Sequence, residues 1–428
     1  MPATLRFMLA SRRSELLGLE DLARTCQLVT AISQLVHALQ KERGYSNIYL
    51  SGNAVHQRQQ LDVISLEAEA LERDVRLALD RIDLDAVSTA DKTRLFTRIA
   101  YALHSLDELP ALRRRIREHA ISMQDATATL VRLIGGLLAV VFEAADTASD
   151  PDITRCLVAL FNFMQGKELA GQERALGVVG FASGYFRAGM LERLEHLLEG
   201  QERCFATFDR FASADSQGLW QSLCGSEVNT QVCRLRNIAR RTSAGAAVEP
   251  QLCELWFELH TRRIDAMKQV ETCLEQDLLQ QCRYSIERIR KDLKSHRKLL
   301  DGIADMHAAA EQAKLFSVQA SDLDAPPSDG MTATVARSTL ELLLTQSVRL
   351  QGLNEELREA RQALDERKQV ERAKQQLMRQ RGFSEGEAYS WLRQAAMNQG
   401  LRLEEVAQRL LALDGSTNTA ARGQRCRH

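Results

Sequence analysis

Residues 28–52, "LVTAISQLVHALQKERGYSNIYLSG", decide the fold. The first half of this stretch repeats apolar residues at steps of three and four, which places them along one face of a helix. The stripe consists of Leu28, Ile32, Leu35, Val36 and Leu39. Continuing it by four residues reaches Arg43, which is followed by Ser46 and Leu50. A guanidinium does not lose its proton to ease burial, so Arg43 needs an anion or carbonyl groups beside it.

The remainder of the chain continues the helical pattern. Of the 428 residues, 45% are hydrophobic and 26% are charged, values typical of a soluble globular protein. Only 6 prolines occur, and the long runs between them consist largely of the helix formers Leu, Ala, Glu, Arg and Gln. Because alternating β-branched strand patterns are nearly absent, we predict an all-α fold.

Net charge, cysteine pattern and the most apolar run restrict which ligands the protein can bind and in which compartment it acts. The net charge of -1 gives the whole protein no general attraction to nucleic acid or membrane, so nucleic-acid binding would need a local patch. The 9 cysteines show neither a CxxC motif nor a metal-like pairing with histidine, which indicates reduced thiols, no structural zinc and no cofactor. The most apolar run, residues 133–142, is shorter than the ~20 residues of a membrane span and predicts a buried helix. We therefore expect a cytoplasmic protein without a membrane partner.

The pattern divides the chain into four regions. Residues 22–313 form a succession of amphipathic helices, with breaks expected near Pro110, Asp150, Gly184 and Gly302, which predicts a helical bundle. Residues 314–332 are rich in Ser, Asp, Ala and Pro and are assigned as a linker. Residues 333–414 form a helical C-terminal unit, and residues 415–428 are expected to be a frayed tail.

The C-terminal unit begins with a heptad pattern. Four leucines recur every seven residues, namely Leu343, Leu350, Leu357 and Leu364. Leu353 and Ala360 occupy the complementary position of the heptad. This seam favours a short coiled coil, and hence a homodimer or a docking helix, although a single helix packed on the bundle remains an alternative. After Gly382, the capping box of residues 384–387 starts a second helix, and a third helix completes a small bundle with Leu392, Val406 and Ala407 in its core.

Two further arginines lie on apolar stripes. Arg263 follows Trp256 and Leu259 at helical spacing, and Arg174 shares a face with Phe163 and Phe181. We expect Arg43, Arg174 and Arg263 to converge on a small planar oxyanion, which a guanidinium binds through two parallel hydrogen bonds. The alternative is that each arginine pairs with a carboxylate near it in the sequence, and the candidates are Glu42, Glu173 and Asp265.

Three segments carry a resemblance to a known family. "QKERGYSNIYLSG", "GKELAGQERALGVVGFASG" and "WFELHTRRIDAMKQVE" resemble the signature blocks of the NIT domain, the nitrate- and nitrite-sensing helical module of bacteria. The resemblance extends to about residue 312. It implies that Arg43 and Arg263 bind the anion, that Arg174 lies in another family motif, and that Gly44 and Ser46 offer donors near the ligand.

The C-terminal segment "AKQQLMRQRGFSEGEAYSWLRQAAMNQGLRLEEVAQRLLAL" resembles the ANTAR domain, an RNA-binding three-helix module of bacterial antiterminators. The resemblance points to Ala373, Lys374, Arg393 and Met397. By its chemistry, Tyr389 joins Lys374 and Arg393 as a candidate contact to an RNA loop, where bases stack on aromatic rings and phosphates bind cations.

The order of the two modules resembles nitrate-responsive transcription antiterminators of the NasR type. It implies that nitrate or nitrite binding releases or reorients the ANTAR unit, which then binds a leader-RNA hairpin and prevents termination. One alternative is a ligand sensor that acts by coiled-coil protein association without RNA, and another is a DNA-binding helix-turn-helix. An enzyme is not expected, because the sequence contains no nucleophile, metal or phosphate-loop constellation.

Overall fold

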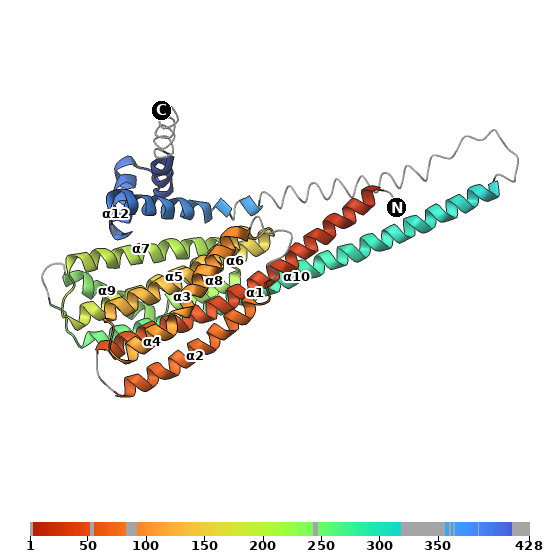
Figure 1. Ribbon diagram of the computed structural model, residues 1–428. Helices are drawn as coiled ribbons and strands as arrows, with labels where there is room; N and C mark the ends of the chain where they lie inside the picture. The colour runs from red at the N-terminus through yellow and green to blue at the C-terminus, as the bar shows by residue number, and fades with distance from the viewer. Residues whose placement is uncertain are drawn as a thin grey trace, which may run out of the picture.

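The computed structural model describes residues 3–51, 55–82, 92–242, 247–317, 356–358, 361–362, 364–383 and 385–412. Every regular element in these ranges is a helix, which confirms the all-α prediction. Figure 1 shows an elongated bundle with the C-terminal helices lying along one side of it.

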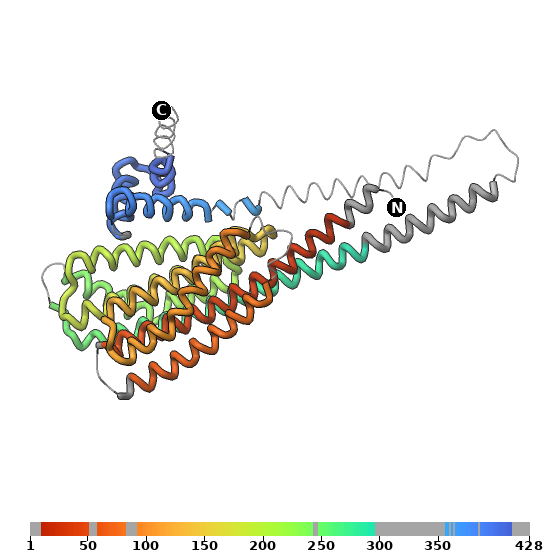
Figure 2. Tube along the Cα trace, viewed as in Figure 1, coloured from red at the N-terminus to blue at the C-terminus, as the bar shows by residue number. Residues whose placement is uncertain are grey.

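The bundle contains α1 (Ala3–Ser51), α2 (Val55–Leu79), α3 (Thr93–Asp107), α4 (Leu109–Arg117), α5 (Met123–Thr147), α6 (Pro151–Ala182), α7 (Ala188–Phe211), α8 (Ala214–Cys224), α9 (Glu227–Arg241) and α10 (Leu252–Ser317). The C-terminal unit consists of a helix over 364–381, α12 (Glu385–Gln399) and a helix over 403–412. α6 lies at the centre, where it packs against α1, α5, α7, α9 and α10. The tube in Figure 2 follows the same path and shows the C-terminal helices beside α7.

Local sequence signals set several helix boundaries. The Asp150 carboxylate accepts a hydrogen bond from the Ile153 backbone N–H at 3.0 Å and caps α6, whose first residue is a proline. α6 ends before Gly184, which has a φ of 76°. Both predicted breaks are thus confirmed. The break predicted at Gly302 is wrong, since α10 continues to Ser317. A single glycine costs only about 1 kcal/mol in a long helix.

The apolar run of residues 133–142 belongs to α5, and most of its side chains are buried in the bundle. By length and composition α5 is the one described helix that could cross a membrane, but 61% of its most apolar window is buried inside the protein. The prediction of a buried helix is confirmed. This burial gives α5 a structural role in the main core, which it shares with α1, α3 and α6.

The C-terminal unit has its own small core. Leu392, Val406 and Ala407 are buried in it together, as predicted from their spacing. Gly382 and Gly400 both have positive φ and end the two helices before them. Within the predicted seam, Leu364 is 1% exposed and joins the core cluster of the bundle. The seam positions Leu343, Leu350, Leu353 and Ala360 lie outside the described residues, as do Ser384 of the capping box, most of the predicted linker and the tail.

We predict that Gly177→Ala destabilises the bundle. A Cβ at this position would overlap the indole ring of Trp256, which is held by a 3.0 Å hydrogen bond from its Nε1 to the Arg174 carbonyl oxygen. Overpacking of this kind costs about 1–3 kcal/mol. As a control, Gly135→Ala adds a methyl group with no neighbour within 4 Å and should be neutral or stabilising. Urea unfolding of both variants measures the difference, and equal free energies of unfolding would contradict the expectation.

Candidate anion site and nucleic-acid interface

Arg43 of α1 is buried and binds a carboxylate of α6. Its Nη1 and Nη2 donate to the two carboxylate oxygens of Glu168 at 2.5 and 3.2 Å. Both side chains are at most 2% exposed. Glu168 also accepts hydrogen bonds from Gln40 at 2.9 Å and from Gln172 at 3.0 Å, so both of its oxygens are fully used. The pair links α1 to the centre of the bundle.

Arg174 lies next to Arg43 and has a different set of partners. Its Nη2 donates to the Gln40 carbonyl oxygen at 2.8 Å and its Nη1 donates to Thr261 Oγ1 at 2.9 Å. Its guanidinium also lies 5.1 Å from the centre of the Phe257 ring. Burial, and next the charge of Arg43, lower the pKa of Arg174 to about 10. Within the described ranges no carboxylate forms an ion pair with Arg174. The carboxylates that act on its charge without pairing are the half-exposed Asp265 and then Glu168, which Arg43 binds.

Two glycines make room for these guanidiniums. A Cβ at Gly44 of α1 would overlap the Arg174 guanidinium, and a Cβ at Gly171 of α6 would overlap that of Arg43. At this contact, therefore, the arginine of each helix packs against a glycine of the other helix. Gly44 thus acts by leaving space for Arg174, in addition to any donor role implied by the family resemblance.

A small cavity lies between the two guanidiniums. It measures about 10 Å³ and is lined by Arg43, Gly44, Asn47, Gly171, Arg174, Ala175, Val178 and Phe257. This space is about that of one water molecule, so an ion larger than water enters only if the helices or Glu168 rearrange locally. The Nε of Arg43, which lines the cavity, has no hydrogen-bond partner in the described part of the chain, and neither has the hydroxyl of Ser46 on the same helix, which does not line it. Ser46 is 1% exposed.

Arg263 belongs to a second buried cluster, centred on Glu173. Its Nη1 donates to Gln201 Oε1 at 3.2 Å and lies 3.9 Å from Glu173 Oε2. Arg236 binds the same carboxylate more closely, at 2.6 and 2.7 Å. Gln201 Nε2 also donates to Glu173 at 2.8 Å. Burial, and next the charge of Arg236, lower the pKa of Arg263 to about 10.

The structure therefore differs from the predicted convergence of three arginines. It brings Arg43 and Arg174 together, whereas Arg263 lies with Arg236 and does not line the cavity between the first two. The alternative pairings also require correction. Glu42 binds Arg113 at 2.7 Å rather than the adjacent Arg43. On a helix, consecutive residues point in different directions, which is why neighbours in sequence make poor partners.

Glu168, Arg236 and Gln201 were not predicted from the sequence. Only Glu168 carried a usable signal, because it shares a helical face with Gly171 and Ala175, two small residues that allow close packing. Arg236 and Gln201 lie on α9 and α7, and their partners are set by how those helices pack against α6.

Two of the candidate RNA-contacting residues of the C-terminal unit, Tyr389 and Arg393, contact α7. The Tyr389 ring lies 4.2 Å from the His196 ring and 4.9 Å from the Arg203 guanidinium. Arg393 Nη1 forms an ion pair with Glu199 at 2.9 Å. His196, Arg203 and Glu199 of α7 thus contact these two side chains.

The other three candidates have different environments. Lys374 is 6% exposed and lines a cavity of about 380 Å³ together with Tyr389 and residues of α7. Its Nζ lies 2.9 Å from Glu371. Ala373 is completely buried in the small core, so its role is packing rather than contact. Met397 is 66% exposed on α12.

Further contacts hold the helix over 364–381 on the bundle. Lys368 Nζ forms an ion pair with Asp146 at 2.5 Å, and the Arg367 guanidinium lies 5.0 Å from the Phe161 ring centre. Arg361, just before this helix, donates to the Ala148 carbonyl oxygen at 3.1 Å. In this arrangement the C-terminal unit is docked on α5, α6 and α7.

We predict that His260 makes stability fall in acid. Burial lowers its pKa to about 3, with the neighbouring Glu173 opposing the shift. Because the folded pKa lies below the unfolded value of about 6.5, the unfolded chain binds the extra proton between these limits. The free energy of unfolding should therefore fall by about 1.4 kcal/mol per pH unit from this histidine as the pH drops from 6 to 4.

Urea unfolding of His260→Gln across this pH range should show a shallower dependence than the unchanged protein. His104→Gln is the control, because the side chain of His104 is 77% exposed, and it should leave the slope unchanged. An unaltered slope in His260→Gln would contradict the assignment.

Comparison with known proteins identifies both parts of the chain. The family model described as nitrate and nitrite sensing, NIT, matches residues 34–279, and the ANTAR domain model matches residues 358–411. A nitrate regulatory protein of Klebsiella oxytoca is 33% identical over 416 residues, which cover 96% of each chain. The solved structure of the NasR transcription antiterminator is similar with a TM-score of 0.58 and 31% identity, and the match covers 97% of this chain and 100% of that one. The chain belongs to the NIT family of nitrate and nitrite sensors and carries a C-terminal ANTAR domain.

Proposed function

We propose that this protein is a one-component transcription antiterminator in which nitrate or nitrite binding to the helical bundle frees the ANTAR unit to bind a leader-RNA hairpin. The families and relatives that it matches are regulatory. The observation that carries the mechanism is the position of Tyr389, which is 5% exposed against α7 and so withheld from RNA, and of Arg393, which is half exposed and paired with Glu199 of α7. The docked arrangement corresponds to the silent state.

The anion enters between α1 and α6. Arg43 and Arg174 carry two buried charges, and only Arg43 forms an ion pair with a carboxylate. A planar oxyanion beside Arg174 adds a negative charge in a geometry that guanidinium groups match. Each charge-assisted hydrogen bond contributes roughly 1.5–3 kcal/mol. Because the cavity holds only about 10 Å³, occupancy shifts either Glu168 or the packing of the two helices. Gly44 and Ser46 lie on α1, one of the two helices that move, and Arg263 acts from the cluster around Glu173.

The signal reaches the ANTAR unit through α6 and α7. α6 carries Glu168 and Arg174 and also Glu173, which accepts a hydrogen bond from Gln201 of α7 at 2.8 Å. On α7, His196, Glu199 and Arg203 flank Gln201 and hold the ANTAR unit. A small displacement of α7 therefore alters both sets of contacts. A coupling free energy of about 1–3 kcal/mol changes RNA affinity about 5–150-fold.

The remaining assignments belong to the same proposal. The sensor comprises residues 22–313, the linker 314–332 and the RNA-binding unit 333–414, followed by the tail at 415–428. The heptad seam before residue 364 pairs two chains into a homodimer. Since the partners are nitrate or nitrite and nascent leader RNA, the protein acts in the cytoplasm, without a membrane partner and without a catalytic role.

We predict that nitrate raises the affinity of the full chain for leader RNA at fixed ionic strength, and that the double variant Arg43→Gln/Glu168→Gln loses this response. The double change removes both charges of a buried pair, because removing Arg43 alone would leave an unpaired carboxylate at a cost of about 3–5 kcal/mol. Calorimetric titration with nitrate, nitrite and chloride measures anion binding, and RNA binding with and without nitrate measures the response.

A matched control exists on the same helix. Glu42 and Arg113 form another buried pair, so Glu42→Gln/Arg113→Gln makes the same chemical change away from the cavity and should keep the nitrate response. An RNA affinity that nitrate never changes would remove the switch. Nitrate-dependent change of oligomeric mass without RNA binding would instead favour signalling through coiled-coil association.

We also predict that Glu199→Arg raises RNA affinity in the absence of nitrate, by about 5-fold or more. The change replaces an ion pair to Arg393 with a like-charge contact and weakens docking. Asp209→Arg reverses an exposed charge on the same helix, and nothing in the described ranges contacts its carboxylate, so it should leave affinity unchanged. If both variants matched the unchanged protein, docking on α7 would not be the silencing contact.

A further inference from the structure

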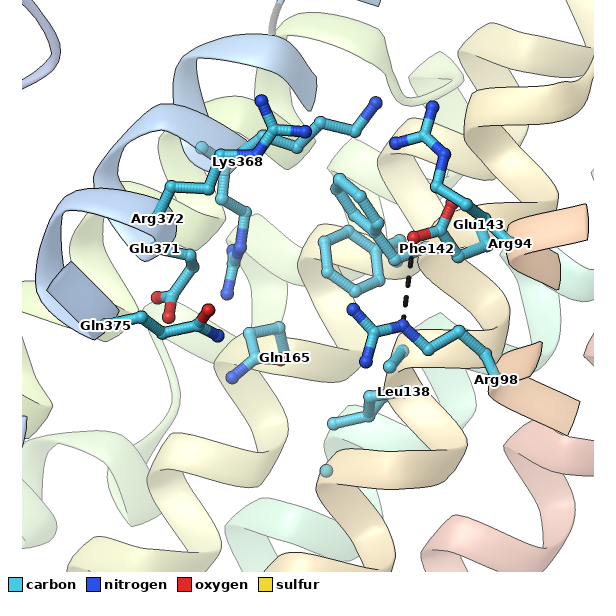
Figure 3. Close-up of a pocket in the computed structure, with 14 residues that line it drawn as sticks. Arg94, Arg98, Leu138, Phe142, Glu143, Gln165, Lys368, Glu371, Arg372 and Gln375 are labelled. Carbon is cyan, nitrogen blue, oxygen red and sulfur yellow. Dashed lines mark ion pairs between the residues drawn. The ribbon is translucent and has the colours of Figure 1, made fainter. Parts of the chain in front are cut away.

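A third cavity lies between the sensor and the helix over 364–381 of the ANTAR unit (Figure 3). It measures about 500 Å³, within the range of small-molecule sites. One wall comes from α3, α5 and α6 and the opposite wall from the helix over 364–381. The floor is apolar, with Leu138, Phe142 and Phe161. The cavity therefore exists only while the ANTAR unit is docked.

The rim of this cavity carries an excess of positive charge. Five cationic side chains line it against the carboxylates of Glu143 and Glu371, and the cations are Arg94, Arg98, Arg367, Lys368 and Arg372. Figure 3 shows Arg94 and Arg98 on the sensor side facing Lys368 and Arg372 on the ANTAR side. Cations that face each other across a docking contact repel. Because Arg94, Arg98 and Arg372 are exposed, water screens part of this repulsion, and a bound anion would offset the rest.

The carboxylates nearby offset only part of this charge. Asp146 is shared by Lys368 at 2.5 Å and Arg94 at 3.3 Å, and Glu143 lies 3.8 Å from Arg98. Glu371 forms an ion pair with Lys374, whose side chain lines the separate cavity of about 380 Å³ beside α7, so its charge is already paired.

Two guanidiniums are left without a carboxylate. Arg372 forms no ion pair or hydrogen bond with any other described residue, and Arg367 donates only to the Cys204 sulfur at 3.7 Å. Their donors are available to a ligand in the cavity.

We propose that this cavity binds a small phosphorylated ligand with two or more negative charges, that is, a diphosphate group either free or at the end of a nucleotide. One phosphoryl group binds to Arg94 and Arg98 and the other binds to Arg372, because a guanidinium group donates two parallel hydrogen bonds to two oxygens of a phosphate. Nitrate carries too little charge and volume for a site of this size. Leader RNA does not fit it either, since the cavity forms only when Tyr389 and Arg393 lie against α7.

A ligand in this position joins the sensor to the ANTAR helix. Because it binds the docked form and loses one wall of its site on undocking, it stabilises the docked form by mass action. It therefore opposes nitrate, and this regulatory consequence rests on the proposed function of the docked state. By reciprocity, release of the ANTAR unit weakens ligand binding by the same factor.

Calorimetry of the full chain with pyrophosphate, ADP, orthophosphate and adenosine tests the site without nitrate or RNA. We expect saturable binding of pyrophosphate and ADP, with orthophosphate at least tenfold weaker and no heat from adenosine. ADP tighter than pyrophosphate identifies a nucleotide site, and equal affinities identify a site for the diphosphate alone. Arg98→Ser and Arg372→Ser, one from each wall, should each weaken pyrophosphate binding tenfold or more.

Arg132→Ser is the matched control, because Arg132 is exposed on α5 and outside the cavity, and it should bind pyrophosphate normally. Absence of pyrophosphate binding, or binding that survives both Arg98→Ser and Arg372→Ser, overturns the site. In a second measurement at matched ionic strength, pyrophosphate should reduce the RNA affinity of the unchanged protein and not that of Arg372→Ser. Binding without this reduction would keep the site and overturn only its regulatory consequence.

Discussion

Burial of charge on α6 is the constraint on which the structure depends. This helix lies at the centre of the bundle and carries Lys167, Glu168, Glu173 and Arg174 with at most 2% of each side chain exposed. A charge in such a place requires a partner, because an unpaired one costs several kcal/mol. The partners come from α1, α9 and α10, so each pair joins α6 to another helix. The packing of the bundle and the state of its ion pairs are therefore linked.

This linkage is what makes the bundle suitable as a sensor. A core held together by apolar contacts alone has no particular response to a small anion, whereas a core with two guanidiniums, only one of them paired with a carboxylate, is sensitive to any anion that reaches it. Arg43 and Arg174 meet this description, and the glycines opposite them keep the contact close. Because the cavity measures only about 10 Å³, the proposed anion binding requires Glu168 or the helices to move.

α7 connects this core with the ANTAR unit. Its inner face contributes Gln201 to the Glu173 cluster, and its outer face contacts Tyr389 and Arg393. Two sites that share one rigid helix have a direct physical path for coupling. The cationic cavity described above lies at the neighbouring contact, between α5 and the helix over 364–381, so docking is balanced by attraction at α7 and repulsion near Arg372.

The sequence by itself determined the helical class, several helix ends and which arginines lie on buried faces, because periodicity, caps and glycines act within one or two turns of chain. The small core of the ANTAR unit follows from the same local pattern. Only the tertiary structure decided the partners. Arg43 binds Glu168, 125 residues away, and Arg263 lies with Arg236 rather than with Arg43. Ion pairs between helices depend on the rotation and offset of packed helices, which helical periodicity leaves undetermined. The docking of Tyr389 on α7 is of the same kind, since it depends on two surfaces that meet only in the folded chain.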